Sequence, residues 1–362
     1  MATVRLENVT KRFGDLVAVD AVNMQIDEGE VLCLLGPSGC GKTTTLRMIA
    51  GLEQESEGDI FIGGERVNDR LPSERDISMV FQFYALYPTL SIGENIGFPL
   101  RSENISDDEA AKRVDEVTRA LQLTDVINRT PNQLGEGEKQ RVAVARAIIR
   151  DPNCFLFDEP LSRLDVTLRQ TMRGEIKEIL SGLSKPTIIV THDQLEALTM
   201  ADRIAVMRAG RIEQIATAHE IFARPANLFV AGFIGTPAMN LLPGTLVSRD
   251  GGSANFDLCN QIAGLDVGPA VAGVAAGSNI TVGIRPRAFA LKSESSDKGL
   301  SVEIDLIEPM GAETLIHARA GDMDVRVVVE RSQTVRVGEH LHLVPKPEQT
   351  LVFGEDERLI GS

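Results

Sequence analysis

The chain contains three short, largely apolar runs, at residues 31–35, 155–157 and 187–190, and each has the length of a buried strand. Helical spacing of apolar residues fills positions 165–182, between the second and third runs. Strands and helices that alternate in this way predict a parallel sheet with helical crossovers. We therefore expect an α/β fold for this part of the chain.

Two other patterns surround the predicted sheet. Residues 1–30 and 58–80 alternate apolar and polar positions, which is typical of strands with one exposed face, and glycine-containing turns interrupt them. Residues 106–150 have helical spacing, and Ser106 with the acidic residues after it predicts a helix start. We expect an antiparallel β region and a helical insert beside the parallel sheet.

The pattern changes again from Pro237 onward, where short β-rich runs are separated by turns. We expect the glycine-rich segment 262–278 to be a loop. The change predicts two domains, a mixed α/β domain over residues 1–235 and an all-β domain over residues 236–362. The clearest β-rich runs are residues 281–284, 302–304 and 325–329.

The first apolar run leads into a glycine-rich loop with the pattern G-x-x-x-x-G-K-[ST]. Its glycines let successive backbone N–H groups point into one hollow, Lys42 adds a positive charge, and Thr43 begins a helix whose N-terminus attracts anions. The strand before the loop and the helix after it argue against a chance match. We predict that the loop binds a nucleoside triphosphate, with Thr43 as a metal ligand. The predicted contacts are Gly36, Pro37, Ser38, Gly39, Cys40, Gly41, Lys42, Thr43 and Thr44.

Polar residues follow other apolar runs at positions where parallel sheets hold ligands. Asp158 and Glu159 end the second run; Asp158 can hold Mg²⁺ beside Thr43, and Glu159 can polarise an attacking water. A single acid at a strand end often only faces solvent, but a pair downstream of a phosphate loop favours catalysis. His192 follows the third run, although a lone histidine is usually structural. Gln82 follows a further apolar pair and can orient water or metal, or be structural.

The composition limits the classes of partner. The chain has 362 residues, 52 of them acidic and 37 basic, for a formal net charge of −15. It has no basic block, so a nucleic-acid backbone is not an expected partner. It has no run of about eighteen apolar residues, and its first residues lack the apolar core of a signal peptide. We therefore expect other subunits to provide any membrane association.

The cysteines show no metal-ligand spacing and predict reduced thiols in the cytosol. Cys33 and Cys154 lie in apolar runs and are expected to be buried, while Cys259 lies in the C-terminal region. Cys40 lies in the phosphate loop near Lys42, a setting that activates a thiol. We expect a maleimide to label Cys40 and MgATP to protect it, unless the side chain packs inward.

The order of these motifs resembles the ATP-binding subunit of an ABC transporter, and the resemblance covers nearly the whole chain. Residues 36–44 resemble Walker A, residues 155–159 resemble Walker B with its catalytic glutamate, and Gln82 resembles the glutamine of the Q-loop. Three more residues match the adenine-stacking aromatic residue, the end of the D-loop and the switch histidine: Phe13, Asp165 and His192.

Other segments narrow the resemblance to the carbohydrate-importer ATPases of the maltose and glycerol-phosphate type. These segments are residues 80–88, 191–198 and 224–235. Residues 283–286 and 308–314 resemble the C-terminal oligonucleotide-binding-like regulatory domain of that group. The group has an acid after Arg-Pro where this chain has Arg287, so a regulatory contact at this position is not carried over.

One motif departs from the family. Residues 134–138 read Leu-Gly-Glu-Gly-Glu in place of the signature Leu-Ser-Gly-Gly-Gln. In the family this segment begins a helix and contacts the γ-phosphate bound by the opposite subunit, so Gly135 and Gly137 are the expected contacts. Glu136 and Glu138 would bring charge towards an anion, which costs about 2–3 kcal/mol for one charge pair at roughly 6 Å. As first-turn acids they would also stabilise their own helix, and both effects can hold together.

The resemblance implies an ATP-hydrolysing subunit that powers a solute importer from the cytoplasmic face of the inner membrane, with ATP and Mg²⁺ as its ligands. A sugar or polyol is the favoured solute, although iron, polyamine and sulfate importers have similar ATPases. The implied roles are ATP binding by Lys42, Mg²⁺ binding by Thr43, Gln82 and Asp158, water activation by Glu159, and contact with the γ-phosphate by His192.

The implied partners are transmembrane permease subunits, reached through the surface near residues 83–90, and indirectly an extracytoplasmic solute-binding protein. A complete phosphate loop beside an altered signature favours pairing with a different ATPase subunit, with a homodimer as the alternative. Two other classes are disfavoured. A soluble ABC ATPase of DNA repair or translation needs basic surfaces or long inserts, and a catalytically weak regulatory subunit does not fit the intact Lys42, Asp158, Glu159 and His192.

Overall fold

The computed structural model describes residues 3–103, 105–250, 253–258, 261–267, 271, 273–292 and 299–360. The chain divides into two compact units, Met1–Ala218 and His219–Ser362. The predicted boundary, between residues 235 and 236, lies after this division. The segment 219–235 belongs to the second unit and not to the first. That segment contains most of helix α7 (Ala218–Ala223) and all of α8 (Leu228–Phe233).

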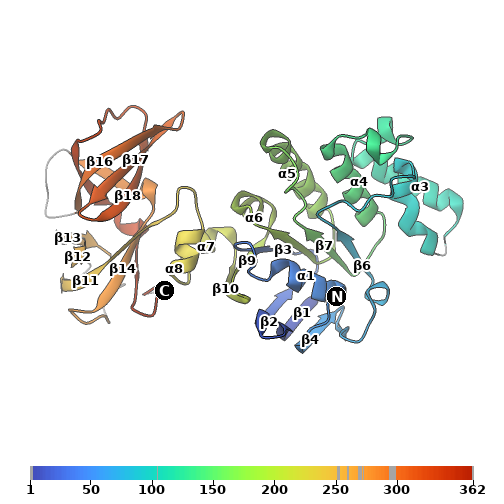
Figure 1. Ribbon diagram of the computed structural model, residues 1–362, viewed down its shortest axis with the longest axis horizontal. Helices are drawn as coiled ribbons and strands as arrows, with labels where there is room; N and C mark the ends of the chain where they lie inside the picture. The colour runs from blue at the N-terminus through green and yellow to red at the C-terminus, as the bar shows by residue number, and fades with distance from the viewer. Residues whose placement is uncertain are drawn as a thin grey trace. The chain divides into compact units, whose positions relative to one another are not determined.

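A six-stranded sheet with the order β10-β9-β3-β8-β7-β6 forms the centre of the first unit (Figure 1). All neighbours in it are parallel except β10, which pairs with β9 in the antiparallel direction. Every residue of β3, β7 and β8 is buried, which confirms the prediction made from the three apolar runs. The strands are β3 (Val31–Leu35), β6 (Ile77–Val80), β7 (Cys154–Asp158), β8 (Thr187–Thr191), β9 (Arg203–Arg208) and β10 (Arg211–Ala216).

Helices connect the parallel strands of this sheet, as the alternating pattern predicts. Helix α1 (Lys42–Ala50) follows β3, α5 (Val166–Ser181) joins β7 to β8, and α6 (Gln194–Met200) joins β8 to β9. The carboxylate of Asp165 accepts hydrogen bonds from the first-turn N–H groups of α5. Asp165 is therefore the N-cap of the helix predicted over residues 165–182.

The predicted antiparallel region and helical insert are both present in the first unit. A four-stranded sheet has the order β2-β1-β4-β5. Among the described residues, three α-helices lie between β6 and β7, and Ser106 caps the second of them. The strands are β1 (Val4–Phe13), β2 (Leu16–Ile26), β4 (Glu57–Ile62) and β5 (Glu65–Arg66). The helices are α2 (Ile92–Gly97), α3 (Asp107–Ala120) and α4 (Glu136–Ile148).

The second unit contains two five-stranded antiparallel sheets around one apolar core. The first has the order β13-β12-β11-β14-β20: β11 (Asn240–Asp250), β12 (Ser253–Leu258), β13 (Gln261–Asp266), β14 (Asn279–Ile284) and β20 (Thr350–Phe353). The second has the order β15-β19-β16-β17-β18: β15 (Phe289–Lys292), β16 (Leu300–Pro309), β17 (Glu313–Ala320), β18 (Met323–Glu330) and β19 (His340–Pro345). The expected architecture, an α/β domain followed by an all-β domain, is confirmed.

The prediction of a loop over residues 262–278 is wrong for residues 262–266. Strand β13 includes residues 262–266 and pairs with β12 along its length. Ala263 and Leu265 are buried in the apolar core, so alternate burial outweighs the glycine content that suggested a loop.

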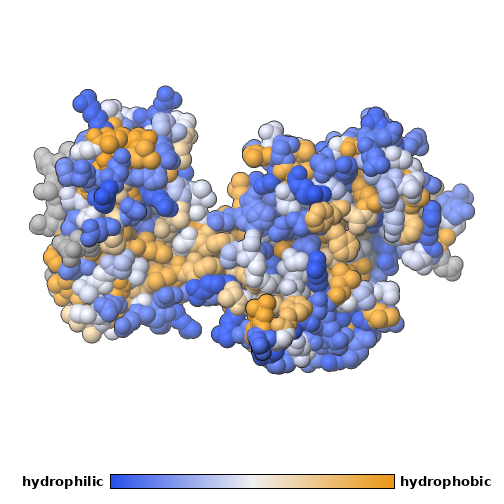
Figure 2. Space-filling view, in the orientation of Figure 1, coloured by the Kyte–Doolittle hydropathy of each residue, from blue (hydrophilic) through white to orange (hydrophobic). Residues whose placement is uncertain are grey.

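Among the described residues, no helix is long and apolar enough to cross a membrane. Figure 2 shows hydrophilic side chains over most of the visible surface of each unit, with smaller apolar areas between them. Such a surface accords with the 89 charged side chains of the chain, 52 acidic and 37 basic.

Candidate active site

The carboxyl ends of four parallel strands gather the predicted motifs at one edge of the six-stranded sheet. The phosphate loop follows β3, Gln82 follows β6, Asp158 ends β7 and His192 follows β8. Because β3, β8, β7 and β6 are successive parallel neighbours, segments far apart in the sequence meet here. Loop residues Pro37, Ser38 and Gly39 are exposed, and Thr44 is half-buried.

The phosphate loop curls around the amine of Lys42. The Lys42 Nζ donates hydrogen bonds to the carbonyl oxygens of Gly36 (2.7 Å) and Pro37 (3.0 Å), and the side chain is buried. Gly41, which precedes α1, has a φ of 107°, and a Cβ there would lie 2.6 Å from the Ala18 carbonyl oxygen. Glycine is therefore required at this turn, and the loop holds a cation ready for an anionic ligand.

Thr43 and Asp158 form a second part of the site. The Thr43 hydroxyl donates a hydrogen bond to the Asp158 carboxylate over 3.2 Å. Burial raises the pKa of Asp158, and the hydrogen bond from Thr43 opposes this rise. A hydroxyl and a carboxylate are hard oxygen donors that fit Mg²⁺, which in such sites also binds substrate phosphates. Among the described residues, no group of three or more His, Cys, Asp or Glu side chains is arranged to hold a metal ion.

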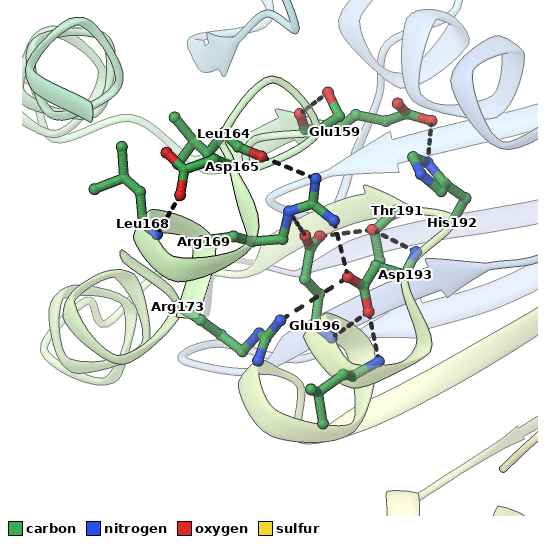
Figure 3. Close-up of polar contacts among 12 residues, drawn as sticks. Glu159, Leu164, Asp165, Leu168, Arg169, Arg173, Thr191, His192, Asp193 and Glu196 are labelled. Atoms are coloured by element: carbon green, nitrogen blue, oxygen red, sulfur yellow. Dashed lines mark hydrogen bonds and ion pairs between the residues drawn. The ribbon is translucent and has the colours of Figure 1, made fainter. Parts of the chain in front are cut away.

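Glu159 is the meeting point of three segments. Its carboxylate accepts a hydrogen bond from the Gln82 amide over 3.0 Å. It also lies 3.2 Å from the His192 Nδ1 (Figure 3). The backbone of Glu159 has a φ of 47°, which is uncommon for a residue with a side chain, and its N–H donates to the Val190 carbonyl. This strained turn aims the carboxylate at the edge of the sheet, where it can act on a water molecule.

A cluster of charged residues behind His192 was not predicted from the sequence. Arg169 on α5 donates hydrogen bonds to the Leu164 carbonyl (3.0 Å) and to the carboxylate of Asp193 (3.4 Å), which also caps α6 (Figure 3). Glu196 is fully buried, accepts a hydrogen bond from the Thr191 hydroxyl (2.6 Å), and has a pKa raised by burial. The position of Asp193 directly after His192 was the available signal. The cluster fixes the turn that carries the histidine.

Phe13 and Asp165, both predicted contacts, lie in different surroundings. Phe13 is 47% exposed at the end of β1, and the Lys11 amine lies 4.7 Å from its ring centroid. An exposed ring of this kind can stack on a base. The Asp165 carboxylate accepts hydrogen bonds from the N–H groups of Thr167 and Leu168, so its observed role is to cap α5.

The altered signature forms the start of helix α4. Gly135 is the N-cap, and its N–H donates a hydrogen bond to the Glu138 carboxylate over 2.8 Å. Glu136 accepts hydrogen bonds from the Lys139 amine (2.8 Å) and the Tyr84 hydroxyl (3.1 Å). A Cβ at Gly137 would lie 2.9 Å from the Leu168 side chain, so this glycine allows α4 to approach α5. The helix-stabilising role expected for the two acids is therefore present.

The structure favours the alternative stated for Cys40, a side chain that packs inward, over a thiol open to a maleimide. The Cys40 side chain is only 3% exposed, and a Cβ at Gly36 would lie 2.7 Å from its Sγ, so the thiol packs inward beneath the loop. Cys33 and Cys154 are buried as predicted, and burial raises the pKa of both thiols. Cys259 lies outside the described residues.

Family comparisons agree with this arrangement. A model of the ABC transporter family matches residues 19–162, a MalK OB fold domain matches residues 235–289, and a TOBE domain matches residues 282–353. Among solved structures, a dimeric ATP-binding cassette in a post-hydrolysis state with ADP and Pi is 34% identical. It covers 59% of this chain and 98% of its own, with a TM-score of 0.53.

Curated relatives extend the similarity to nearly the full length. An uncharacterized ABC transporter ATP-binding protein of Sinorhizobium fredii is 45% identical over 96% of this chain and 91% of its own length. An sn-glycerol-3-phosphate import ATP-binding protein of Rhizobium johnstonii is 42% identical over 98% of this chain and 95% of its own. A sulfoquinovosyl glycerol transport ATP-binding protein of Agrobacterium fabrum is 42% identical over 98% and 96%. The resemblance seen in the sequence is confirmed, and the chain belongs to the family of ATP-binding, ATP-hydrolysing subunits of ABC transporters.

Proposed function

We propose that this chain hydrolyses ATP to power an importer of a sugar or polyol-type solute. The observation that carries the hydrolytic part is the convergence of Gln82 and His192 on the Glu159 carboxylate beside the phosphate loop. The solute class is supported by relatives named for sn-glycerol-3-phosphate import and sulfoquinovosyl glycerol transport. Iron, polyamine and sulfate are the alternative solutes.

The phosphate loop and Lys42 would hold the triphosphate, and Phe13 would stack on the base. Thr43 and Asp158, which already contact each other, would hold Mg²⁺ together with phosphate oxygens. When bound, Mg²⁺ supplies positive charge that offsets the charge of the phosphates. Gln82 is the third proposed metal contact, but its amide faces Glu159, so it would have to turn towards the ion.

Glu159 would accept the proton of the attacking water. A carboxylate held by an amide and an imidazole is oriented before substrate arrives, which lowers the cost of reaching the transition state. His192 is exposed at the edge of the sheet and would contact the γ-phosphate as the bond to it breaks. Asp165, Gly135 and Gly137 would contribute to the nucleotide site across a dimer interface.

Permease subunits are the proposed membrane partners, and they would hold the chain at the cytoplasmic face of the membrane. The segment 83–90 supports this proposal because Phe83 and Tyr87 expose 67% and 40% of their surface. A solute-binding protein would act on the chain only through the permeases. The C-terminal domain, residues 236–362, would be regulatory, and its Arg287 is held by the Glu313 carboxylate over 2.7 and 2.9 Å.

A second ATPase subunit with an intact signature is the proposed partner within the dimer. Gly135 lacks the hydroxyl that the family signature carries, and two acids stand beside it. The site formed with this chain's signature would bind ATP and turn over slowly, whereas the site formed with its phosphate loop would be fast. A homodimer is the alternative, and it would contain two slow sites.

The test is to purify the complex from its native membrane, determine the mass of each subunit, and reconstitute it in vesicles. We expect a second ATPase subunit, and ATP hydrolysis stimulated by a sugar or polyol presented with the binding protein. Stimulation only by iron, a polyamine or sulfate would replace the solute class. Two copies of this chain with brisk stimulated hydrolysis would refute the heterodimer, and no hydrolysis at all would refute the proposed function.

A further inference from the structure

Tyr84 and the altered signature are joined by a contact that no motif of the family describes. Glu136 stands where the family signature has its first glycine. Its carboxylate uses both oxygens within its own chain: Oε1 accepts from the Lys139 amine (2.8 Å) and Oε2 accepts from the Tyr84 hydroxyl (3.1 Å). The carboxylate is therefore held beside α4 by two donors from different elements.

Tyr84 is held in place by the same helix that carries Glu136. Tyr84 and Ala85 have φ values of 60° and 51°, a conformation that costs energy for residues with a side chain. Arg146 on α4 donates hydrogen bonds to the carbonyl oxygens of Tyr84 (2.7 Å) and Ala85 (2.6 Å). The Tyr84 side chain is only 5% exposed. The strained turn therefore aims the hydroxyl at Glu136 from a fixed backbone.

The protonation states suit this contact. The hydrogen bond from Lys139 is the main cause that lowers the pKa of Glu136, so its carboxylate stays charged at neutral pH. The Tyr84 hydroxyl is the donor in its contact with Glu136, because an ionised carboxylate can only accept. A negative charge is therefore present at the signature at neutral pH, and the two hydrogen bonds fix where it lies.

We propose that Tyr84 is a positioning residue that, with Lys139, holds the Glu136 carboxylate against its own subunit. The start of α4 can then still receive a triphosphate bound by the opposite subunit. This inference rests on the proposed function, because it concerns the nucleotide site that the signature completes. It assigns a role to the hydroxyl of Tyr84, two residues after Gln82.

The contact itself can be tested without an activity measurement. The chain has two tyrosines, Tyr84 and Tyr87, and no tryptophan, so fluorotyrosine labelling gives two ¹⁹F resonances, which Tyr87→Phe assigns. We expect Glu136→Gln to shift the resonance of Tyr84 and to leave that of Tyr87 in place. A Tyr84 resonance that ignores Glu136→Gln would overturn the proposal.

The effect on the nucleotide site is tested by a double-mutant cycle in the purified transporter complex. We expect Tyr84→Phe to raise the ATP concentration for half-maximal hydrolysis by about 5-fold, because the freed carboxylate repels the phosphates. In a Glu136→Gly background the same change should have an effect within about 1.5-fold, because no carboxylate remains to be held. Glu175→Gln is the matched control, since it weakens the pair that Arg141 of α4 makes with Glu175 of α5.

The outcomes separate the two proposals. An equal effect of Tyr84→Phe in both backgrounds, or an equal effect of Glu175→Gln, would assign the loss to general loosening of α4. Either result would overturn only the positioning role of Tyr84. A wild-type complex without any ATP hydrolysis would overturn the proposed function instead. A 5-fold effect of Tyr84→Phe that is seen only when Glu136 is present supports both the positioning role of Tyr84 and the proposed function.

Discussion

The first unit contains two pairs of acidic residues with opposite surroundings. Asp158 and Glu159 lie at the end of a buried strand, where their carboxylates contact Thr43, Gln82 and His192, and Lys42 and Arg47 offset part of the charge of Asp158. Glu136 and Glu138 lie in the first turn of α4, where a helix N-terminus, Lys139 and Tyr84 stabilise them. The first pair is oriented towards a ligand, and the second pair is engaged by its own subunit.

The difference shows that the environment decides what a carboxylate can do. Burial raises the pKa of Asp158, so its ionised form is less favourable than that of an exposed aspartate, and a bound cation would stabilise it. A hydrogen bond from Lys139 lowers the pKa of Glu136, so its ionised form is already satisfied. A group left unsatisfied by the fold is available for chemistry, whereas a satisfied group contributes to stability.

The largest effect is expected from Glu159→Gln. The amide keeps the shape of the side chain but cannot take the proton of the attacking water, so steady hydrolysis should fall by about 100-fold or more. The ATP affinity should stay within about 2-fold, because Lys42 and the loop amides remain. Parallel measurements of hydrolysis and nucleotide binding check this result. Turnover close to that of the wild type would remove Glu159 from the mechanism.

Asp158→Asn is expected to reduce Mg²⁺-dependent hydrolysis by about 100-fold and to stabilise the nucleotide-free protein. A carboxyl whose folded-state pKa is raised contributes stability only while it is protonated, and that stability is lost as the pH rises through the folded-state pKa. The variant should therefore unfold at a higher temperature than the wild type at pH 7, and the difference should vanish in acid.

Asp151→Asn provides the matched control for this prediction. Its carboxylate is 84% exposed before the same strand, where it pairs with Lys185. Thermal unfolding should change little in this control. The quantity to compare is the unfolding temperature of Asp158→Asn minus that of the wild type. If this difference is the same at pH 7 and at pH 4, burial does not destabilise the ionised carboxylate.

A smaller effect is expected when the signature is restored by Gly135→Ser, Glu136→Gly and Glu138→Gln together. Removing the two acids and adding a hydroxyl should speed hydrolysis by the complex about 5- to 10-fold, which corresponds to about 1 kcal/mol in the barrier. In a heterodimer the gain should appear at the site that uses the phosphate loop of the partner. If the hydrolysis rate of the complex does not change, the acids of the signature do not affect the nucleotide site, and the contrast between the two acidic pairs fails.

The smallest effects concern two glycines that differ in the space around them. A Cβ at Gly137 would lie 2.9 Å from Leu168, so Gly137→Ala should destabilise the first unit by about 1–2 kcal/mol. Gly174 lies within α5 with no atom within 4 Å of such a Cβ, so Gly174→Ala should stabilise it by about 0.5–1 kcal/mol. Denaturant titration measures both. Equal changes would show that Gly137 is not a packing requirement.

The sequence by itself determined the order of the elements and the location of the motifs. The apolar runs became the buried strands β3, β7 and β8, and the phosphate loop lies between a strand and a helix as its pattern requires. These features depend on residues close together in the chain, which is why periodicity and local motifs reveal them.

Only the tertiary structure decided how individual side chains are used. The thiol of Cys40 turned inward, β13 formed because β12 lies beside it, and Arg169 met Asp193 through the contact of α5 with α6. Tyr84 reaches Glu136 across 52 positions of sequence, and Gln82 reaches Glu159 across 77. Burial and hydrogen-bond partners come from distant segments that packing brings together, and no local pattern records them.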